Sequence, residues 1–179
     1  MSLILGPNGT VMLKWWINVS HEAHLNIRDY AEGTVCMGRG LPISDSTNQK
    51  SKTRISTELK IVGVDEFMPG ILWARNVLKD QHYGVTENII FQNNRSALLL
   101  ENNSKSSIVN RKKHINIIIF ATGRIQKGEI SVEWCPTNYM NGDLFTNPNP
   151  GSLLWRFRDL IMGVVVQLDP GLGNPNNFH

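Results

Sequence analysis

The stretch GVTENIIFQNNRSA (residues 84–97) decides the fold that the sequence predicts. The short, mostly apolar run over residues 87–92 is typical of a buried strand. Asn94 is a residue type that favours a helix N-cap, so a helix is expected from Asn94 to about Glu101. A strand that runs directly into a helix indicates βα alternation in this part of the chain.

Upstream of this stretch the pattern is different. Strands are expected at residues 13–20, 33–38 and 41–46, joined by Gly/Pro turns as an antiparallel meander. From about Arg54 the apolar residues recur mostly at intervals of three and four, which predicts a long amphipathic helix with Trp73 near its apolar face. Pro69-Gly70 is expected to kink or weaken this helix, because both residues are unfavourable in a helix interior.

Downstream, the polar tract 102–107 predicts a loop. A helix is expected at residues 112–123, a strand at 129–135 and a last helix at 153–162. The whole order is three strands, a helix, a strand, helices, a strand and a helix. This order predicts an α/β fold in which helices pack on the faces of one mixed sheet.

The composition fits one globular domain, with 41% hydrophobic and 18% charged residues in 179. We expect a lead-in at residues 1–11, the domain at 12–165 and a disordered tail at 166–179. The formal net charge of +3 permits a polyanionic partner without requiring one.

No apolar run approaches the ~20 residues that a membrane span needs, and the N-terminal run is too short for a signal peptide. A cytoplasmic, intracellular protein without a membrane partner is therefore expected. Cys36 and Cys135 match no metal-ligand spacing and are expected to be reduced core thiols.

An ordered set of segments resembles the ribonuclease H domain at the C-terminal end of copia-type retrotransposon polyproteins. The set covers about residues 12–165 and consists of residues 56–73, 84–97, 113–117, 132–146 and 157–163. The resemblance implies a ribonuclease H-like fold with a mixed five-stranded sheet, in which three antiparallel strands precede two parallel ones, and helices on both faces. It also implies cleavage of the RNA strand in RNA/DNA hybrids, and a reverse transcriptase in the same polyprotein.

The resemblance also places the family's catalytic site. Its members hold two magnesium or manganese ions with Asp, Glu, Asp and Asp, and the matching positions here are Asn18, Lys60, Asn93 and Asp143. Only Asp143 keeps a carboxylate, and it is the one vestigial metal ligand. Neither Glu58 nor Asp65 is a plausible replacement for the lost Glu, since helix geometry turns them about 200° and 140° away from Lys60.

Two-metal hydrolysis needs anionic oxygen ligands around ions ~4 Å apart. Asparagine keeps the shape of aspartate without its charge, and Lys60 places an ammonium where a cation should bind. We therefore expect no bound metal pair, an ion pair between Lys60 and Asp143, and a catalytically inactive copy.

The replacements share one direction of mutation. Each change from Asp to Asn or from Glu to Lys needs one guanine-to-adenine change in the gene. The same holds for the changes from glycine to Asp29 and Glu32, at positions where the family tends to have glycine. The chain has 19 asparagines and seven aspartates, which fits that direction of change.

Other interpretations stay open. The domain could retain weak binding to an RNA/DNA hybrid or another nucleic acid through its basic residues, which are Lys112, Lys113, His114, Arg124 and Lys127. It could instead be a working nuclease in which Asp143 and substrate phosphates supply most ligands, or a relic without a role. Outside the family context, Lys60 is a solvated helix lysine, the basic cluster a solvated face, and Asp143 a helix cap.

Overall fold

The structure is a computed structural model that describes residues 11–20, 30–37, 43–48, 56–97, 115–141 and 151–164. Five strands form one sheet in the order β3-β2-β1-β4-β5. The strands are β1 (Val11–Ser20), β2 (Tyr30–Cys36), β3 (Ile43–Asn48), β4 (Val85–Gln92) and β5 (Ser131–Trp134). The first three pair antiparallel, whereas β4 and β5 run parallel to β1. This is the mixed sheet that the sequence predicts.

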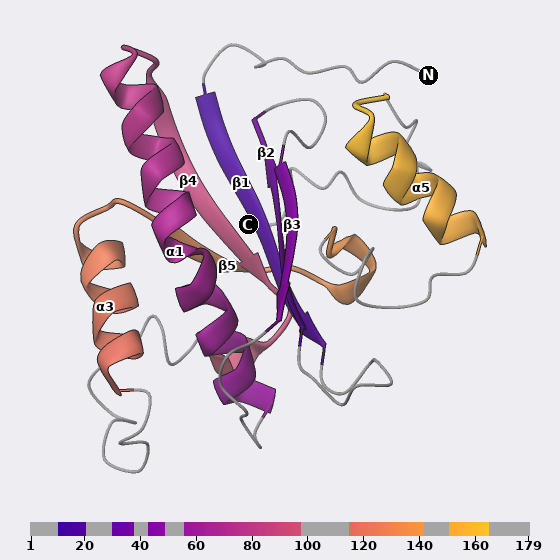
Figure 1. The fold of residues 1–179 in the computed structure, drawn as a ribbon, viewed down its shortest axis with the longest axis horizontal. Helices are drawn as coiled ribbons and strands as arrows, with labels where there is room; N and C mark the ends of the chain where they lie inside the picture. The colour runs from indigo at the N-terminus through magenta and orange to yellow at the C-terminus, as the bar shows by residue number, and fades with distance from the viewer. Residues whose placement is uncertain are drawn as a thin grey trace.

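Helices lie on both faces of this sheet (Figure 1). The long helix α1 (Ser56–Asp80) and α3 (Ile115–Gln126) lie on one side, and α5 (Gly151–Ile161) lies on the other. A short 3-10 helix, η3 (Thr137–Tyr139), follows β5. Helix α1 remains one element through Pro69-Gly70, and both of these residues are exposed.

The core lies between α1 and the central strands. Alternate residues of β1 (Leu13, Trp15 and Ile17) pack with Val64, Met68 and Ile71 of α1 in one buried cluster. Ile90 of β4 and Val132 of β5 belong to the same cluster. This packing holds α1 against the central strands. It therefore determines which residues of α1 lie near the ends of the strands.

All five strands differ from the expected ranges in at least one bound, and the difference that bears most on the site is the start of β2. The sequence predicts a loop through Glu32 and a strand from Gly33, whereas β2 begins at Tyr30. The sequence before Gly33 is polar, but its pairing with both β1 and β3 extends β2 toward the N-terminus. Glu32 therefore lies inside the sheet, where it is fully buried.

The expected place of Trp73 near the apolar face of the long helix is wrong. Trp73 is 63% exposed, and Trp134 and Trp155 are also exposed. Trp73 lies two residues after the buried Ile71, and two residues on a helix turn the side chain about 200° away from the core. Only Trp15 is buried, and Trp16 stacks on Phe91 with a centroid separation of 5.4 Å.

Both cysteines are thiols, as predicted, with Cys135 buried and Cys36 half-buried. In the helices within the described ranges, no segment is both long and apolar enough to cross a bilayer. Residues 1–10 of the expected lead-in and the whole expected tail, residues 166–179, lie outside the described residues, whereas Val11 begins β1. The bounds of the domain therefore stay a prediction.

Candidate functional site

The structure brings two of the four family positions into direct contact. Asn18 lies near the end of β1 and Lys60 lies in the second turn of α1, and both are buried. Lys60 Nζ donates a hydrogen bond to Asn18 Oδ1. The sequence predicts the convergence of these residues, but it predicts Asp143 as the partner of Lys60. Asp143 lies outside the described residues, so its pairing with Lys60 stays a prediction, and Asn18 is a partner of Lys60 that the sequence did not predict.

Lys60 reaches Asn18 beyond the end of β4. The parallel pairing of β1 with β4 extends to Trp16 and Phe91, whereas β1 continues to Ser20. The chain leaves the sheet directly after Gln92. The last residues of β1 are therefore paired on the β2 side but extend past the β4 pairing, where the long lysine side chain from α1 has access to the Asn18 amide.

A carboxylate that the sequence did not predict lies next to this contact. Glu32 of β2 is paired with Asn18 of β1 in the antiparallel register. Residues directly opposite each other in such a pair place their side chains on the same face of the sheet. Glu32 is fully buried, as a charged residue seldom is without a compensating group. Glu32 lies there because β2 begins earlier than predicted. The polar residues around Glu32 gave no sign of a strand in the sequence.

Asn93, the third family position, directly follows β4 and is half-buried. Its neighbour Asn94 confirms the expected helix N-cap. Asn94 Oδ1 accepts hydrogen bonds from the backbone N–H groups of Ser96 (3.0 Å) and Ala97 (3.1 Å). Residues 95–97 are helical, and the rest of that helix lies outside the described residues. The cap holds the chain in its turn away from the sheet at Asn93.

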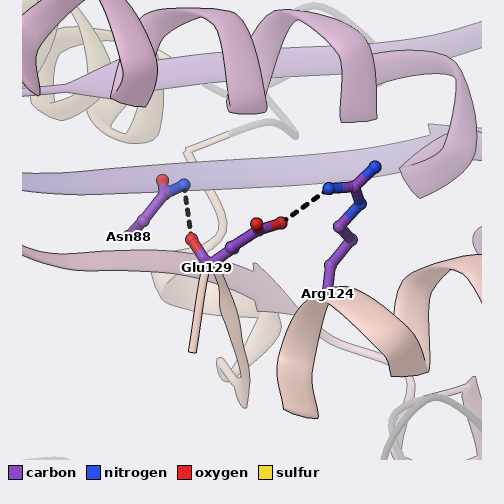
Figure 2. Close-up of polar contacts among 3 residues, drawn as sticks. All are labelled: Asn88, Arg124 and Glu129. Carbon is purple, nitrogen blue, oxygen red and sulfur yellow. Dashed lines mark hydrogen bonds and ion pairs between the residues drawn. The ribbon is translucent and has the colours of Figure 1, made fainter. Parts of the chain in front are cut away.

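Of the five basic residues expected to bind nucleic acid, the structure describes Arg124 and Lys127, and neither of these two lies at this site. Lys112, Lys113 and His114 lie outside the described residues. Arg124, in the last turn of α3, is engaged with Glu129 by an ion pair of 2.8 Å (Figure 2). Lys127 follows the same helix and is exposed.

The Arg124–Glu129 pair lies at the opposite end of the sheet from Asn18. The backbone oxygen of Glu129 accepts a hydrogen bond from Asn88 Nδ2 (3.1 Å), as Figure 2 shows. Asn88 is paired with Leu13 of β1, five residues before Asn18. At ~3.3 Å per residue this is about 16 Å along the strand. The structure therefore separates Arg124 and Lys127 from the Asn18–Lys60 contact.

Charge around Glu129 is favourable to its ionised form. The hydrogen bond from Arg124 lowers the pKa of the Glu129 carboxyl below its usual 4.5, against a smaller opposing effect of burial. The positive charges of Arg124, Lys127 and Arg75 act in the same direction as the hydrogen bond. Arg124 is thus partly neutralised by a neighbouring carboxylate.

Arg95 is a basic residue at the site end of the sheet that the sequence analysis did not single out. Its guanidinium lies over the ring of Trp134, 4.4 Å from the centroid. Trp134 ends β5 and is paired with Gln92, the residue before Asn93. Arg95 directly follows the N-cap Asn94. A basic residue at that position was the only sign in the sequence that Arg95 lies at this end of the sheet.

The described side chains do not suit a pair of divalent metal ions. Magnesium and manganese prefer carboxylate oxygens, and Asn18 offers a neutral amide oxygen that already accepts from an ammonium. In the parts of the chain that the structure describes, no three His, Cys, Asp or Glu side chains gather as metal ligands. Burial raises the pKa of Asp65, the half-buried carboxyl five residues beyond Lys60 on α1.

No protein-family model matches the chain. Among solved structures it is similar to the N-terminal RNase H domain of a Mycobacterium tuberculosis protein, solved as a fusion with maltose-binding protein. The two are 10% identical over 82% of this chain and 99% of that one, with a TM-score of 0.51. At this identity the likeness shows the fold alone, and the chain has a ribonuclease H-like fold.

Two further matches have lower TM-scores. RNase H1 of the archaeon Halobacterium salinarum is 9% identical over 75% of this chain and 91% of its own, with a TM-score of 0.48. The protease-reverse transcriptase of prototype foamy virus is 11% identical over 91% of this chain, with a TM-score of 0.47. This chain covers 22% of the viral protein.

Proposed function

We propose that the chain is a ribonuclease H-like domain of a copia-type retrotransposon polyprotein that no longer performs two-metal hydrolysis. Residues 12–165 form the domain, and a reverse transcriptase precedes it in the polyprotein. The contact between Lys60 and Asn18 carries the proposal, because it places a positive charge at the position that must attract two cations. Neither magnesium nor manganese is expected to bind there as a pair.

The proposed remaining activity is weak binding of RNA/DNA hybrids or other nucleic acid. Lys112, Lys113, His114, Arg124 and Lys127 are the residues proposed for it. The net charge of +3 supports this, since a polyanion is attracted mainly through its phosphates. The two described residues of this set, Arg124 and Lys127, lie apart from Asn18 and Lys60, so substitution of the family's metal positions leaves them in place.

The test is a cleavage assay on an RNA/DNA hybrid with magnesium and with manganese. The unchanged chain is expected to give no cleavage above background. The triple variant Asn18→Asp, Lys60→Glu and Asn93→Asp restores the family's carboxylates and is expected to gain metal-dependent cleavage. Adding Asp143→Asn to the triple variant is the matched control, and it is expected to abolish the gain.

A working nuclease with an unconventional metal site gives the opposite result. In that case the unchanged chain cleaves the hybrid when metal is added, and Asp143→Asn abolishes the cleavage. Such a pattern from purified protein would reject the proposed loss of catalysis. An inactive triple variant that remains folded would show that the scaffold no longer supports the chemistry.

A further inference from the structure

Two neighbours hold Arg124 in one orientation at the end of α3. Its guanidinium lies over the ring of Phe120, 4.8 Å from the centroid. Its Nη1 donates a hydrogen bond of 2.8 Å to Glu129 Oε2 (Figure 2). A guanidinium carries several N–H donors besides the one that this bond uses. Because the ring and the carboxylate already fix the planar group, little side-chain entropy remains to be lost when it binds an anion.

Arg75 of α1 lies on the helix face that packs against the same region. It lies four residues after Ile71 and three before Leu78, so the three side chains lie along one face of the helix. Ile71 and Ile130 belong to one buried cluster, and Leu78 and Ile125 pack against it. Ile125 and Ile130 directly follow the two residues of the ion pair in the sequence. The face of α1 that carries Arg75 therefore packs on the segment that carries the ion pair.

The charges that act on Glu129 do not balance. The pKa of its carboxyl is lowered first by the hydrogen bond from Arg124, against a smaller opposing effect of burial. The positive charges of Arg124, Lys127 and Arg75 lower this pKa further. Three cations thus act on one carboxylate, which leaves an excess of two positive charges within this group of four side chains. Lys127 is exposed and Arg75 is half-buried, so the excess charge is accessible to an anion in solution.

We infer that Arg75, Arg124 and Lys127 form one phosphate-binding face across the ends of α1 and α3 that holds the backbone of a nucleic-acid duplex. In this face Glu129 orients Arg124 and weakens the binding. The inference rests on the proposed binding of nucleic acid, and it adds Arg75 as a contact and Glu129 as an opposing charge. Guanidinium groups suit phosphate oxygens because they offer paired N–H donors in one plane. A polyanion is the ligand that exposed cations on two helices attract most strongly, because each phosphate contact releases counterions.

Fluorescence anisotropy titrations of an RNA/DNA hybrid between about 50 and 200 mM salt test the inference. Each phosphate contact contributes about threefold to the loss of affinity over this range. Arg75→Gln is therefore expected to lose about threefold less affinity across the range than the unchanged chain. Glu129→Gln removes the opposing carboxylate and is expected to bind at least about twofold more tightly at the lower salt concentration. This second variant tests the same face whether or not Arg75→Gln folds.

The Arg158–Asp159 pair on α5 is the matched control. It is an ion pair of 2.7 Å on the opposite side of the sheet (Figure 1). Arg158→Gln and Asp159→Asn make the corresponding changes of charge there, and both are expected to leave the affinity and its salt dependence unchanged. The inference is wrong if Arg158→Gln alters the salt dependence as much as Arg75→Gln does. It is also wrong if Glu129→Gln does not strengthen the binding.

Two results separate this inference from the proposed function. A hybrid that binds the unchanged chain and Arg75→Gln equally at every salt concentration would support nucleic-acid binding and overturn the phosphate-binding face. If no hybrid binds, the proposed binding fails, and thermal unfolding in inorganic tripolyphosphate tests the cations alone. A saturable rise in Tm that Arg75→Gln and Arg124→Gln each reduce at least about twofold would support an anion site here. No rise, or an equal rise in these variants, would overturn it.

Discussion

At the scale of single residues, the proposed replacement of carboxylates alters charge more than shape. Asparagine at positions 18 and 93 fills nearly the volume of aspartate, and the strand ends that carry both positions are formed. The convergence of Asn18 and Lys60 could be predicted from the ordered family segments. The nearness of Glu32 could not, because it depends on the register between two strands and on a strand start within polar sequence.

Glu129 gives a prediction of pH dependence at this scale. Because Arg124 lowers the folded-state pKa of Glu129 below 4.5, the pair stabilises the fold above that pH. The contribution is lost as the pH falls through the lower, folded-state value. Glu129→Gln is therefore expected to cost under about 1 kcal/mol at neutral pH. The difference from the unchanged chain should shrink steadily below pH 4.5.

Urea denaturation at a series of pH values measures this effect. Glu87→Gln removes an exposed carboxyl on β4 and is the matched control. A difference between Glu129→Gln and the unchanged chain that grows as the pH falls would contradict the expected sign.

At the scale of helices and strands, periodicity and turn residues predict the type and order of the described strands and α-helices, whereas the short 3-10 helix after β5 was not predicted. The three-residue and four-residue spacing in α1 identifies the face that packs on the sheet, and the apolar run before Asn93 identifies β4. The bounds could not be predicted to the residue, since pairing partners distant in sequence decide where β2 begins. Trp73 shows the same limit, because aromatic character alone does not place a side chain on the packed face of a helix.

Gly33 yields a prediction at this scale, because α1 lies very close to β2 there. A Cβ at this position would lie 2.7 Å from two atoms of the Phe67 ring. Gly33→Ala is therefore expected to lower the free energy of unfolding by about 1–3 kcal/mol. Combining it with Phe67→Leu should recover part of the loss, because a smaller side chain gives the new methyl group room.

The control for this prediction is Gly70→Ala. Gly70 is an exposed residue within α1, and nothing lies within 4 Å of the position of its added Cβ. Alanine there is expected to stabilise the fold by about 0.5–1 kcal/mol. Chemical denaturation of the three variants gives the comparison. Equal effects at Gly33 and Gly70 would show that the contact with Phe67 does not limit the packing of α1.

At the scale of the whole molecule, the mixed sheet separates the contact of Lys60 with Asn18 from the Arg124–Glu129 pair. Asn18, Lys60 and Asn93 lie toward the end at which β4 and β5 finish, and the Arg124–Glu129 pair lies toward the end at which these strands begin. The sequence predicted the four converging positions and the basic residues as two sets, without placing one relative to the other. It could not show this separation, since that depends on the register of Asn88 against Leu13.

Binding to nucleic acid can therefore be tested independently of the substituted site. Affinity for an RNA/DNA hybrid is expected to fall steeply with added salt and to be unchanged by EDTA. Lys127→Gln should weaken binding. It should also reduce the slope of log K against log salt concentration by about the amount that one phosphate contact contributes. Fluorescence anisotropy titrations at several salt concentrations measure both quantities.

Gln126→Ala changes an exposed neutral neighbour of Lys127 and is the control. It is expected to leave the salt slope unchanged. Binding that requires magnesium, or a slope that Lys127→Gln does not alter, would argue against Lys127 as a phosphate contact.

The two edges of the sheet have a consequence for self-association. Among the described strands, β3 pairs only with β2, and an edge strand presents N–H and C=O groups on which another chain can build. Here that edge reads ISDSTN, with Asp45 exposed at its centre, and the opposite edge is only the four residues of β5. A charge on one edge and brevity on the other both oppose fibril-like stacking of copies. The charge on β3 and the short length of β5 therefore oppose aggregation, and neither depends on Asn18, Lys60 or Asn93.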